Sequence, residues 1–144
     1  MAKLTGPTGK VYAVDIQERM LEALKGYAAR DGVTNIETIL SRPDDPMLPA
    51  GALDLILMVD VYHEFDNPQV MLQKLRAALK PGGRMVLLEY RKEDPNVPIR
   101  LEHKMTVAEA KAEVEAEGFR LDKVIDTLPR QHILIFVPGP RKVQ

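Results

Sequence analysis

Apolar and β-branched residues occur in short runs that turn-forming residues separate. The run Lys10–Asp15 follows the turn 6–9 and predicts a buried strand. From Gln17 to about Arg30 apolar residues recur every three or four positions, which predicts an amphipathic helix that ends before Gly32. Asn35–Leu40 predicts a second strand. Strand, helix and strand in this order predict a parallel βαβ unit.

The second half of the chain continues this alternation. The segment 41–52 is rich in proline and predicts a loop. Leu53–Asp60 is almost continuously apolar, as expected for a central parallel strand covered on both faces. Asn67 and Pro68 mark the start of a helix, which we expect to end at Pro81–Gly83. Met85–Tyr90 predicts the next strand.

The last third predicts one more helix and a strand pair. Thr106 can cap a helix over Val107–Glu117 that Gly118 closes. Phe119–Thr127 and Ile133–Val137 predict two antiparallel strands. We therefore expect a single α/β domain over residues 1–144, with the tail from residue 141 frayed.

Composition narrows the classes of function. The formal net charge of −1 gives no broad basic surface, so we expect neither nucleic acid nor membrane as a partner. The chain has no cysteine, which fits a cytoplasmic location, and no apolar run long enough to span a bilayer. The histidines His63, His103 and His132 lie far apart in sequence and lack a known ligand spacing, so the sequence predicts no metal site.

Three stretches in this order resemble class I S-adenosylmethionine-dependent methyltransferases of the type 11 kind. They are Val11–Ile16, Ala52–Phe65 and Leu79–Tyr90, and the resemblance covers about residues 9–137. It implies a Rossmann-like, mostly parallel sheet that ends in an antiparallel strand pair. It also implies S-adenosylmethionine as cofactor and methyl transfer as activity.

The resemblance assigns cofactor contacts by position. Asp15 ends its strand and matches the acid that accepts the ribose hydroxyls, and Ile16 would lie against the adenine. Asp44 or Asp45 matches the acid that accepts from the adenine amino group; both remain candidates, with Asp45 preferred. The residues at the end of the central strand match the site of the methionine portion of the cofactor: Val59, Asp60 and Val61.

Catalytic candidates follow that strand. His63 could deprotonate a methyl acceptor because its ordinary pKa suits a general base, and Glu64 adjoins it. The alternative is that His63 only caps the turn into the next helix and that Glu64 is solvated. Tyr90 or Arg91 could contact substrate or lie at the rim. The resemblance places the acceptor pocket around the segment 91–104.

The sequence also departs from the family pattern. Family members begin with a strand and a glycine-rich turn that passes close to the cofactor, and no such turn precedes Lys10–Asp15. We expect the first strand and helix of the methyltransferase fold to be missing, which leaves two strands with bare edges. They could pair directly, a second copy could cover them, or another polypeptide could do so. We predict self-association as a homodimer.

The sequence is compatible with three interpretations of the chain. The first is methyl transfer to a small-molecule acceptor. The second is a non-catalytic methyltransferase-like module that self-associates or binds a partner. The third is a piece of a longer methyltransferase. The sequence favours methyltransferase ancestry without separating the three.

Overall fold

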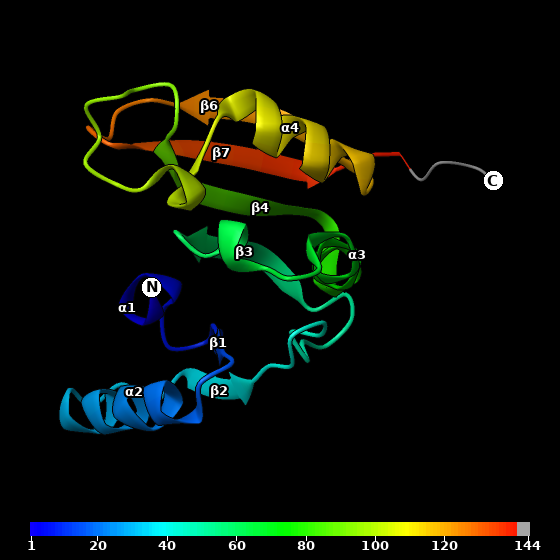
Figure 1. Cartoon of the computed structure of the whole chain (residues 1–144). Helices are drawn as coiled ribbons and strands as arrows, with labels where there is room; N and C mark the ends of the chain where they lie inside the picture. Colours follow the sequence, from blue (N-terminus) through cyan, green and yellow to red (C-terminus); the bar gives the residue numbers. More distant parts are fainter. Residues whose placement is uncertain (141–144) are drawn as a thin grey trace. The chain divides into compact units, whose positions relative to one another are not determined.

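The structure is a computed structural model that describes residues 1–140 (Figure 1). The chain divides into two compact units, Met1–Leu48 and the part from Pro49 onward. The expectation of a single domain stays a prediction.

The first unit is a βαβ unit preceded by one helical turn. Its elements are α1 (Ala2–Thr5), β1 (Val11–Asp15), α2 (Glu18–Arg30) and β2 (Ile36–Leu40). The strands β1 and β2 pair in parallel, with Val11 opposite Ile36 and Asp15 opposite Leu40. Gly32 follows α2 with a φ of 66°, the left-handed conformation that glycine adopts without strain. The predicted parallel unit is confirmed.

The helix α1 was not predicted. The side-chain amide of Asn35 donates to the carbonyl oxygens of Ala2 and Gly6 across 2.9 and 3.0 Å. Because Asn35 directly precedes β2, these bonds fix α1 to the start of the small sheet. A single helical turn has too few residues to show a periodic pattern, so no sequence signal indicated this helix.

The second unit is built on a five-stranded sheet with the order β3-β4-β7-β6, and β5 also pairs with β4. β3 runs parallel to β4, whereas β7 is antiparallel to both β4 and β6. The mixed sheet with a parallel part and an antiparallel C-terminal pair agrees with the fold class inferred from the sequence. The elements are β3 (Leu53–Val59), η1 (Tyr62–Glu64), α3 (Pro68–Ala78), β4 (Leu79–Arg91), η2 (Leu101–His103), β5 (Lys104–Met105), α4 (Val107–Ala116), β6 (Phe119–Ile125) and β7 (Gln131–Pro138).

The helices of this unit begin where the sequence predicted. Asn67 caps α3, with its side chain accepting from the backbone of Val70. Thr106 and Glu109 form a reciprocal capping box at the start of α4. Figure 1 shows α4 lying along β6 and β7.

The end of α3 differs from the prediction. The helix ends at Ala78, and Leu79 already belongs to β4. Leu79 is buried and pairs with Leu53, and the amide of Ala52 donates to Ala78 O across 2.9 Å. The sequence Pro81–Gly83 therefore lies inside an irregular stretch of β4 instead of ending the helix.

Within the first unit β1 pairs with β2, and within the second unit β3 pairs with β4 through a parallel ladder. Direct pairing of the two bare strands stays a prediction. Covering of the edges by a second copy or by another polypeptide stays a prediction.

The core of the second unit lies between the sheet and its helices. Alternate residues of β4 and β7 point into it, because side chains on a strand alternate between faces. The helices contribute Leu72, Leu75, Ala78, Ala110 and Val114, and the strands Met58, Met85, Leu87, Leu134 and Phe136, all of them buried. None of the helices in the described part of the chain is long and apolar enough to cross a membrane.

Candidate functional site

Asp60 directly follows β3, the first strand of the large sheet, and has an unusual backbone conformation. Its φ is 51°, in the left-handed region, while its amide still donates to Leu88 O of β4 across 2.8 Å. Gln131 on β7 donates a hydrogen bond to its Oδ2 across 2.6 Å. Its other oxygen, Oδ1, is buried and accepts no hydrogen bond from any described residue. Buried carboxylate oxygens without a donor are costly, so this one marks a place where a ligand group could bind.

The turn after Asp60 brings His63 onto β4. Nδ1 of His63 lies 2.7 Å from Oε2 of Glu89, and the side chains are 7% and 0% exposed. When one ring nitrogen of a histidine is hydrogen-bonded to a carboxylate, the orientation of the ring is fixed. The pair therefore holds His63 with Nε2 directed away from Glu89.

Glu89 is the buried charge at the centre of this site. Burial raises its pKa above the ordinary value, and the hydrogen bond and charge of His63 oppose that rise. The nearby carboxylate of Asp60 also acts to raise it. Its second oxygen, Oε1, has no hydrogen-bond partner among the described residues.

The short strand β5 brings a second histidine to the same place. β4 extends beyond β3, and Tyr90 pairs with Lys104 of β5 on one side and with Gln131 of β7 on the other. β5 therefore continues the edge of β4 on which β3 has ended. Because η2 directly precedes β5, this pairing also places η2 beside η1. The last residue of η2 is His103.

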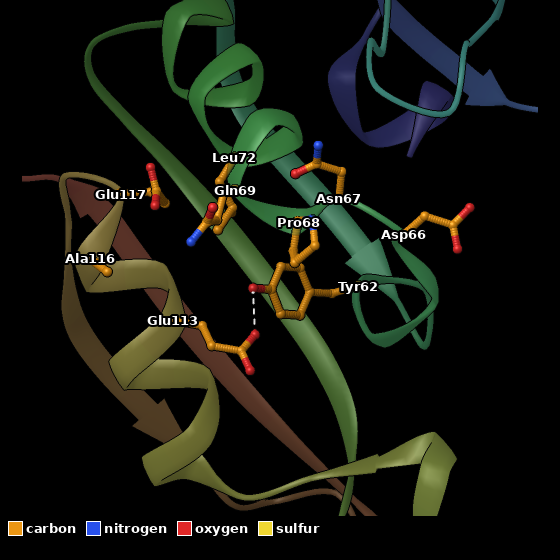
Figure 2. A pocket seen from close by; sticks show the side chains of 9 residues that line it. All are labelled: Tyr62, Asp66, Asn67, Pro68, Gln69, Leu72, Glu113, Ala116 and Glu117. Carbon is orange, nitrogen blue, oxygen red and sulfur yellow. Dashed lines mark hydrogen bonds between the residues drawn. The ribbon is translucent and has the colours of Figure 1, made fainter.

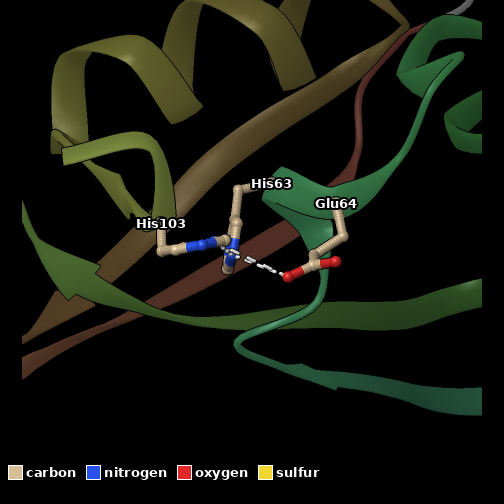
Figure 3. Close-up of side chains that lie close together, drawn as sticks. All are labelled: His63, Glu64 and His103. Carbon is tan, nitrogen blue, oxygen red and sulfur yellow. Dashed lines mark hydrogen bonds and ion pairs between the residues drawn. The ribbon is translucent and has the colours of Figure 1, made fainter. Parts of the chain in front are cut away.

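His63, His103 and Glu64 direct one ligand atom each toward a common point (Figure 3). Nε2 of His63 lies 3.2 Å from Nδ1 of His103. Oε1 of Glu64 lies 3.5 Å from the first of these nitrogens and 3.6 Å from the second. We call these three residues the His/Glu cluster.

A cavity of about 280 Å³ adjoins the cluster. His63 lines it together with Lys92, Glu102 and Lys104 of the segment that the resemblance assigned to the acceptor. Lys104 is 5% exposed, and its ammonium group donates to Asp94 O across 3.3 Å. It has no ion pair within the part of the chain that the structure describes. The cavity thus offers a buried positive charge to a polar ligand.

A second pocket, of about 380 Å³, lies between η1, α3 and α4 (Figure 2). The ring of Tyr62 forms one wall, and its hydroxyl group donates to Glu113 of α4 across 2.9 Å. Burial is the main reason why the pKa of Tyr62 is far above its ordinary value, and Glu113 raises it further. This pocket holds no pair of groups suited to proton transfer, since its one buried titratable group is a tyrosine held neutral.

The first unit carries the residues that the resemblance assigned to adenosine. Asp15 ends β1, and its Oδ1 accepts from the amide of Gln17 across 2.8 Å, while Oδ2 accepts from no described residue. Ile16 follows and is 54% exposed. Ser41 donates to Asp15 O across 2.9 Å, so the next loop starts at the same edge of the small sheet. In that loop, Oδ1 of Asp45 accepts from the amide of Met47 across 2.8 Å.

Asp44 lies beside Asp45 in a tight turn and is exposed. Arg42 and Asp45 exchange backbone hydrogen bonds of 2.8 and 3.3 Å around this turn. Both aspartates therefore lie in the loop that follows β2, and the structure leaves both as candidates.

The side chains of Arg91 and His132 have structural roles. The guanidinium of Arg91 donates to Leu128 O and Asp126 O across 2.7 and 3.2 Å, which holds the loop between β6 and β7. His132 is buried between two carboxylates, Glu93 at 2.7 Å and Asp126 at 3.2 Å.

Glu64 is 57% exposed, which agrees with the alternative that its side chain is solvated. It also faces both histidines of the cluster.

Glu89 and His103 are the residues that the sequence did not reveal as part of the site. Glu89 had a signal, because it follows Met85 and Leu87 at the alternate positions of β4 that face the core. A charged residue in such a position requires a buried partner. His103 had no local signal, since forty residues separate it from His63 and only the register of β5 brings them together.

Comparison with known proteins agrees with this architecture. A family model described as a methyltransferase domain matches residues 1–131. The chain is 29% identical over 91 residues to the ubiquinone/menaquinone biosynthesis C-methyltransferase UbiE of Cupriavidus taiwanensis, a match that covers 63% of this chain and 37% of that protein. The chain thus spans well under two thirds of the length of this curated relative.

Solved structures extend the likeness to most of the chain. A SAM-dependent methyltransferase from Aquifex aeolicus superposes with a TM-score of 0.87 and 26% identity, over 94% of this chain and 72% of that one. The [4+2]-cyclase SpnF shares the fold alone, with a TM-score of 0.79 and 13% identity, over 96% of this chain and 70% of that one. The model match, the relatives and the fold agree, and the chain belongs to the S-adenosylmethionine-dependent methyltransferase domain family.

Proposed function

We propose that this chain binds S-adenosylmethionine and transfers its methyl group to a small-molecule acceptor held in the cavity beside His63. Family membership supports the cofactor, because methyltransferases of this family use S-adenosylmethionine. The fold alone would not suffice, because one scaffold can serve unrelated functions, as the likeness to a cyclase illustrates. The proposal therefore depends on whether residues of this chain fit the cofactor.

The edge of the small sheet fits the adenosine portion. The free oxygen of Asp15 can accept hydrogen bonds from ribose hydroxyls, and the exposed side chain of Ile16 offers an apolar surface for the adenine. Asp44 or Asp45 would accept from the adenine amino group. Ligands of open α/β sheets bind at the carboxyl ends of the parallel strands, and Asp15 lies at that end of β1.

The observation that carries the proposal is the unpaired Oδ1 of Asp60. A buried carboxylate oxygen without a donor is stabilised by a cation, and the cofactor carries two positive groups, an ammonium and a sulfonium. Val59 and Val61, on either side, are 50% and 40% exposed and offer apolar contact. We assign these residues to the methionine portion of the cofactor.

When bound, the cofactor supplies an electrophilic methyl group on a positively charged sulfur. The residues of this chain would position the acceptor, largely by holding it close and correctly oriented. His63 lines the cavity in a fixed orientation, with Glu64 beside it. We propose that these two residues position the reacting group of the acceptor.

Calorimetric titration of S-adenosylmethionine into the full chain tests the proposal. We expect saturable binding that Asp15→Ala and Asp60→Asn each weaken about tenfold or more, the loss expected when a hydrogen bond to a charged group disappears. Asp54→Asn is the matched control, because this exposed side chain lies at the opposite end of β3 from Asp60. Absence of heat at millimolar cofactor would reject the enzyme proposal.

Exposed apolar residues favour a second candidate function, self-association. In β3 the side chains of Leu55, Leu57 and Val59 alternate on one face and are 37%, 40% and 50% exposed. In the small sheet Val14 and Leu40 are 37% and 49% exposed. Apolar faces of this kind commonly form interfaces, and a second copy could bury them.

Sedimentation equilibrium separates this candidate from the first. A dimer that Leu57→Glu dissociates, while Leu101→Glu leaves it intact, would support the interface on β3. Leu101 is the matched control, because it is exposed but lies on η2. A monomer at every concentration would reject self-association without affecting the proposal of methyl transfer.

A further inference from the structure

We propose that His63, His103 and Glu64 bind one divalent transition-metal ion, Zn²⁺ or an ion of similar ligand preference. The three ligand atoms form a triangle with sides of 3.2, 3.5 and 3.6 Å. Zinc bonds to nitrogen and oxygen measure about 2.0–2.2 Å, and tetrahedral angles then separate the ligand atoms by about 3.3–3.6 Å. The triangle therefore already has the size of one face of a tetrahedral zinc site.

The buried Glu89 prepares His63 for this role. Metal-binding histidines commonly donate their second ring N–H to a carboxylate, which fixes the tautomer and the orientation of the ring. Nδ1 of His63 lies 2.7 Å from Oε2 of Glu89, in the position for that donation. The lone pair of Nε2 then points toward His103 and Glu64.

A hydrogen bond between the two imidazoles is the competing explanation of their contact. It would account for the 3.2 Å distance between the ring nitrogens, with one N–H donating to the other ring. It does not account for Glu64, whose Oε1 lies 3.5 and 3.6 Å from these nitrogens, too far for a good hydrogen bond to either. A shared metal ion gives all three atoms one partner.

The ligand chemistry selects the class of ion. Two imidazole nitrogens and one carboxylate oxygen suit Zn²⁺, Fe²⁺, Co²⁺ and Ni²⁺, whereas Mg²⁺ and Ca²⁺ prefer oxygen ligands alone. Glu64 and His103 are 57% and 46% exposed, so an ion can reach the cluster from solvent. Three protein ligands leave one coordination position for water or a substrate atom, as in catalytic zinc sites.

The role of this ion follows from the position of the cluster beside the cavity that His63 lines. A metal ion lowers the pKa of an oxygen ligand, so an acceptor hydroxyl or enol bound to it would lose its proton to water before reacting. This role rests on the proposed methyl transfer and names an oxygen acceptor as the substrate class. With the metal bound, the Nε2 of His63 is a ligand and not a general base. The binding of the metal itself does not depend on the proposed function.

Calorimetry with Zn²⁺ and absorption spectroscopy with Co²⁺, each on the full chain without cofactor, test the site directly. We expect one ion per chain and a visible Co²⁺ spectrum typical of nitrogen and oxygen ligands. His103→Ala should remove the spectrum, because His103 is a partly exposed residue of a short turn and its loss leaves the core intact. Glu89→Gln should weaken binding about 10- to 100-fold, the usual effect of losing a partner of a metal-binding histidine.

Two control variants separate this site from other metal-binding groups. Glu102→Gln should bind Zn²⁺ like the wild type, because Glu102 is an exposed carboxylate next to His103 that does not belong to the cluster. His132→Asn should also retain binding, which would exclude the other buried histidine. Far-UV circular dichroism of each variant shows that it is folded.

Several results would overturn the proposal. They are wild-type binding no tighter than millimolar, unchanged binding in His103→Ala and Glu64→Gln, or loss of binding in His132→Asn. Failure of the metal site and failure of methyl transfer are distinguishable, because titration with S-adenosylmethionine reports on Asp15 and Asp60, which are not ligands of the ion. Zinc binding without cofactor binding would keep the metal site and reject the enzyme.

Discussion

The hydroxyl group of Tyr62 donates a hydrogen bond to Oε2 of Glu113 across 2.9 Å and joins the turn after β3 to α4 (Figure 2). Tyr62 is 2% exposed, and it directly precedes His63. The bond therefore anchors the turn that carries His63 and Glu64 of the His/Glu cluster.

Tyr62→Phe removes this anchor and keeps the ring. We expect the free energy of unfolding to fall by about 1.5–3 kcal/mol, the usual value of a hydrogen bond to a charged group. Urea denaturation measures the change. Tyr27→Phe is the control, because Tyr27 is exposed on α2, and it should be neutral. Equal stability of the two variants would show that the bond does not contribute.

Thr106→Ala removes the capping box of α4. The side chain of Thr106 accepts from the amide of Glu109 across 2.9 Å, and the carboxylate of Glu109 accepts from the amide of Thr106 across 2.9 Å. We expect a loss of about 1 kcal/mol in unfolding free energy. Thr127→Ala, in the exposed loop before β7, should leave stability unchanged under the same denaturation protocol.

Arg91→Met keeps the apolar stem of the side chain and removes its guanidinium group. The carbonyl oxygens of Asp126 and Leu128 then lose their donor, so the loop between β6 and β7 should open. We expect faster amide hydrogen exchange in residues 126–131 and a loss of about 1–3 kcal/mol. Arg84→Met is the matched control on the same strand, because Arg84 is exposed. Similar exchange in both variants would contradict the role of Arg91.

Acid sensitivity should depend on Glu93. Partial burial acts to raise the pKa of Glu93. Hydrogen bonds from His132 and from the amide of Val107 lower this pKa, and together the lowering contributions outweigh the effect of burial, so the net shift is downward. A carboxyl group whose pKa is lower in the folded protein contributes its stabilisation above its unfolded pKa of about 4.3. That contribution is lost as the pH falls through the folded pKa.

Glu93→Gln should therefore flatten the decrease in stability below about pH 4.5. Denaturation midpoints between neutral pH and pH 3 measure the slope. Glu102→Gln is the control, since within residues 1–140 its ion pairing is limited to a 3.9 Å contact with Arg100. A slope for Glu93→Gln equal to that of the wild type would mean that other carboxyl groups carry the acid sensitivity.

Local patterns in the sequence were sufficient for most helices and strands. The three- and four-residue spacing of α2, the cap at Thr106 and the apolar run of β3 act through neighbours in the chain, and the structure confirms each of them. The end of α3 was misplaced, because the pairing of Leu79 with Leu53 is a tertiary contact that overrides the turn signal of Pro81–Gly83.

The chemistry of the site depended on contacts between distant residues. By itself, the sequence determined the family resemblance and the acidic residues at the ends of the predicted parallel strands. Both follow from short apolar runs and their order along the chain. Only the tertiary structure placed Glu89 against His63, and His103 beside both. The reason is physical: strand register decides which side chains meet across a sheet, and β5 pairs with β4 beyond the end of β3, a relation that no local pattern encodes.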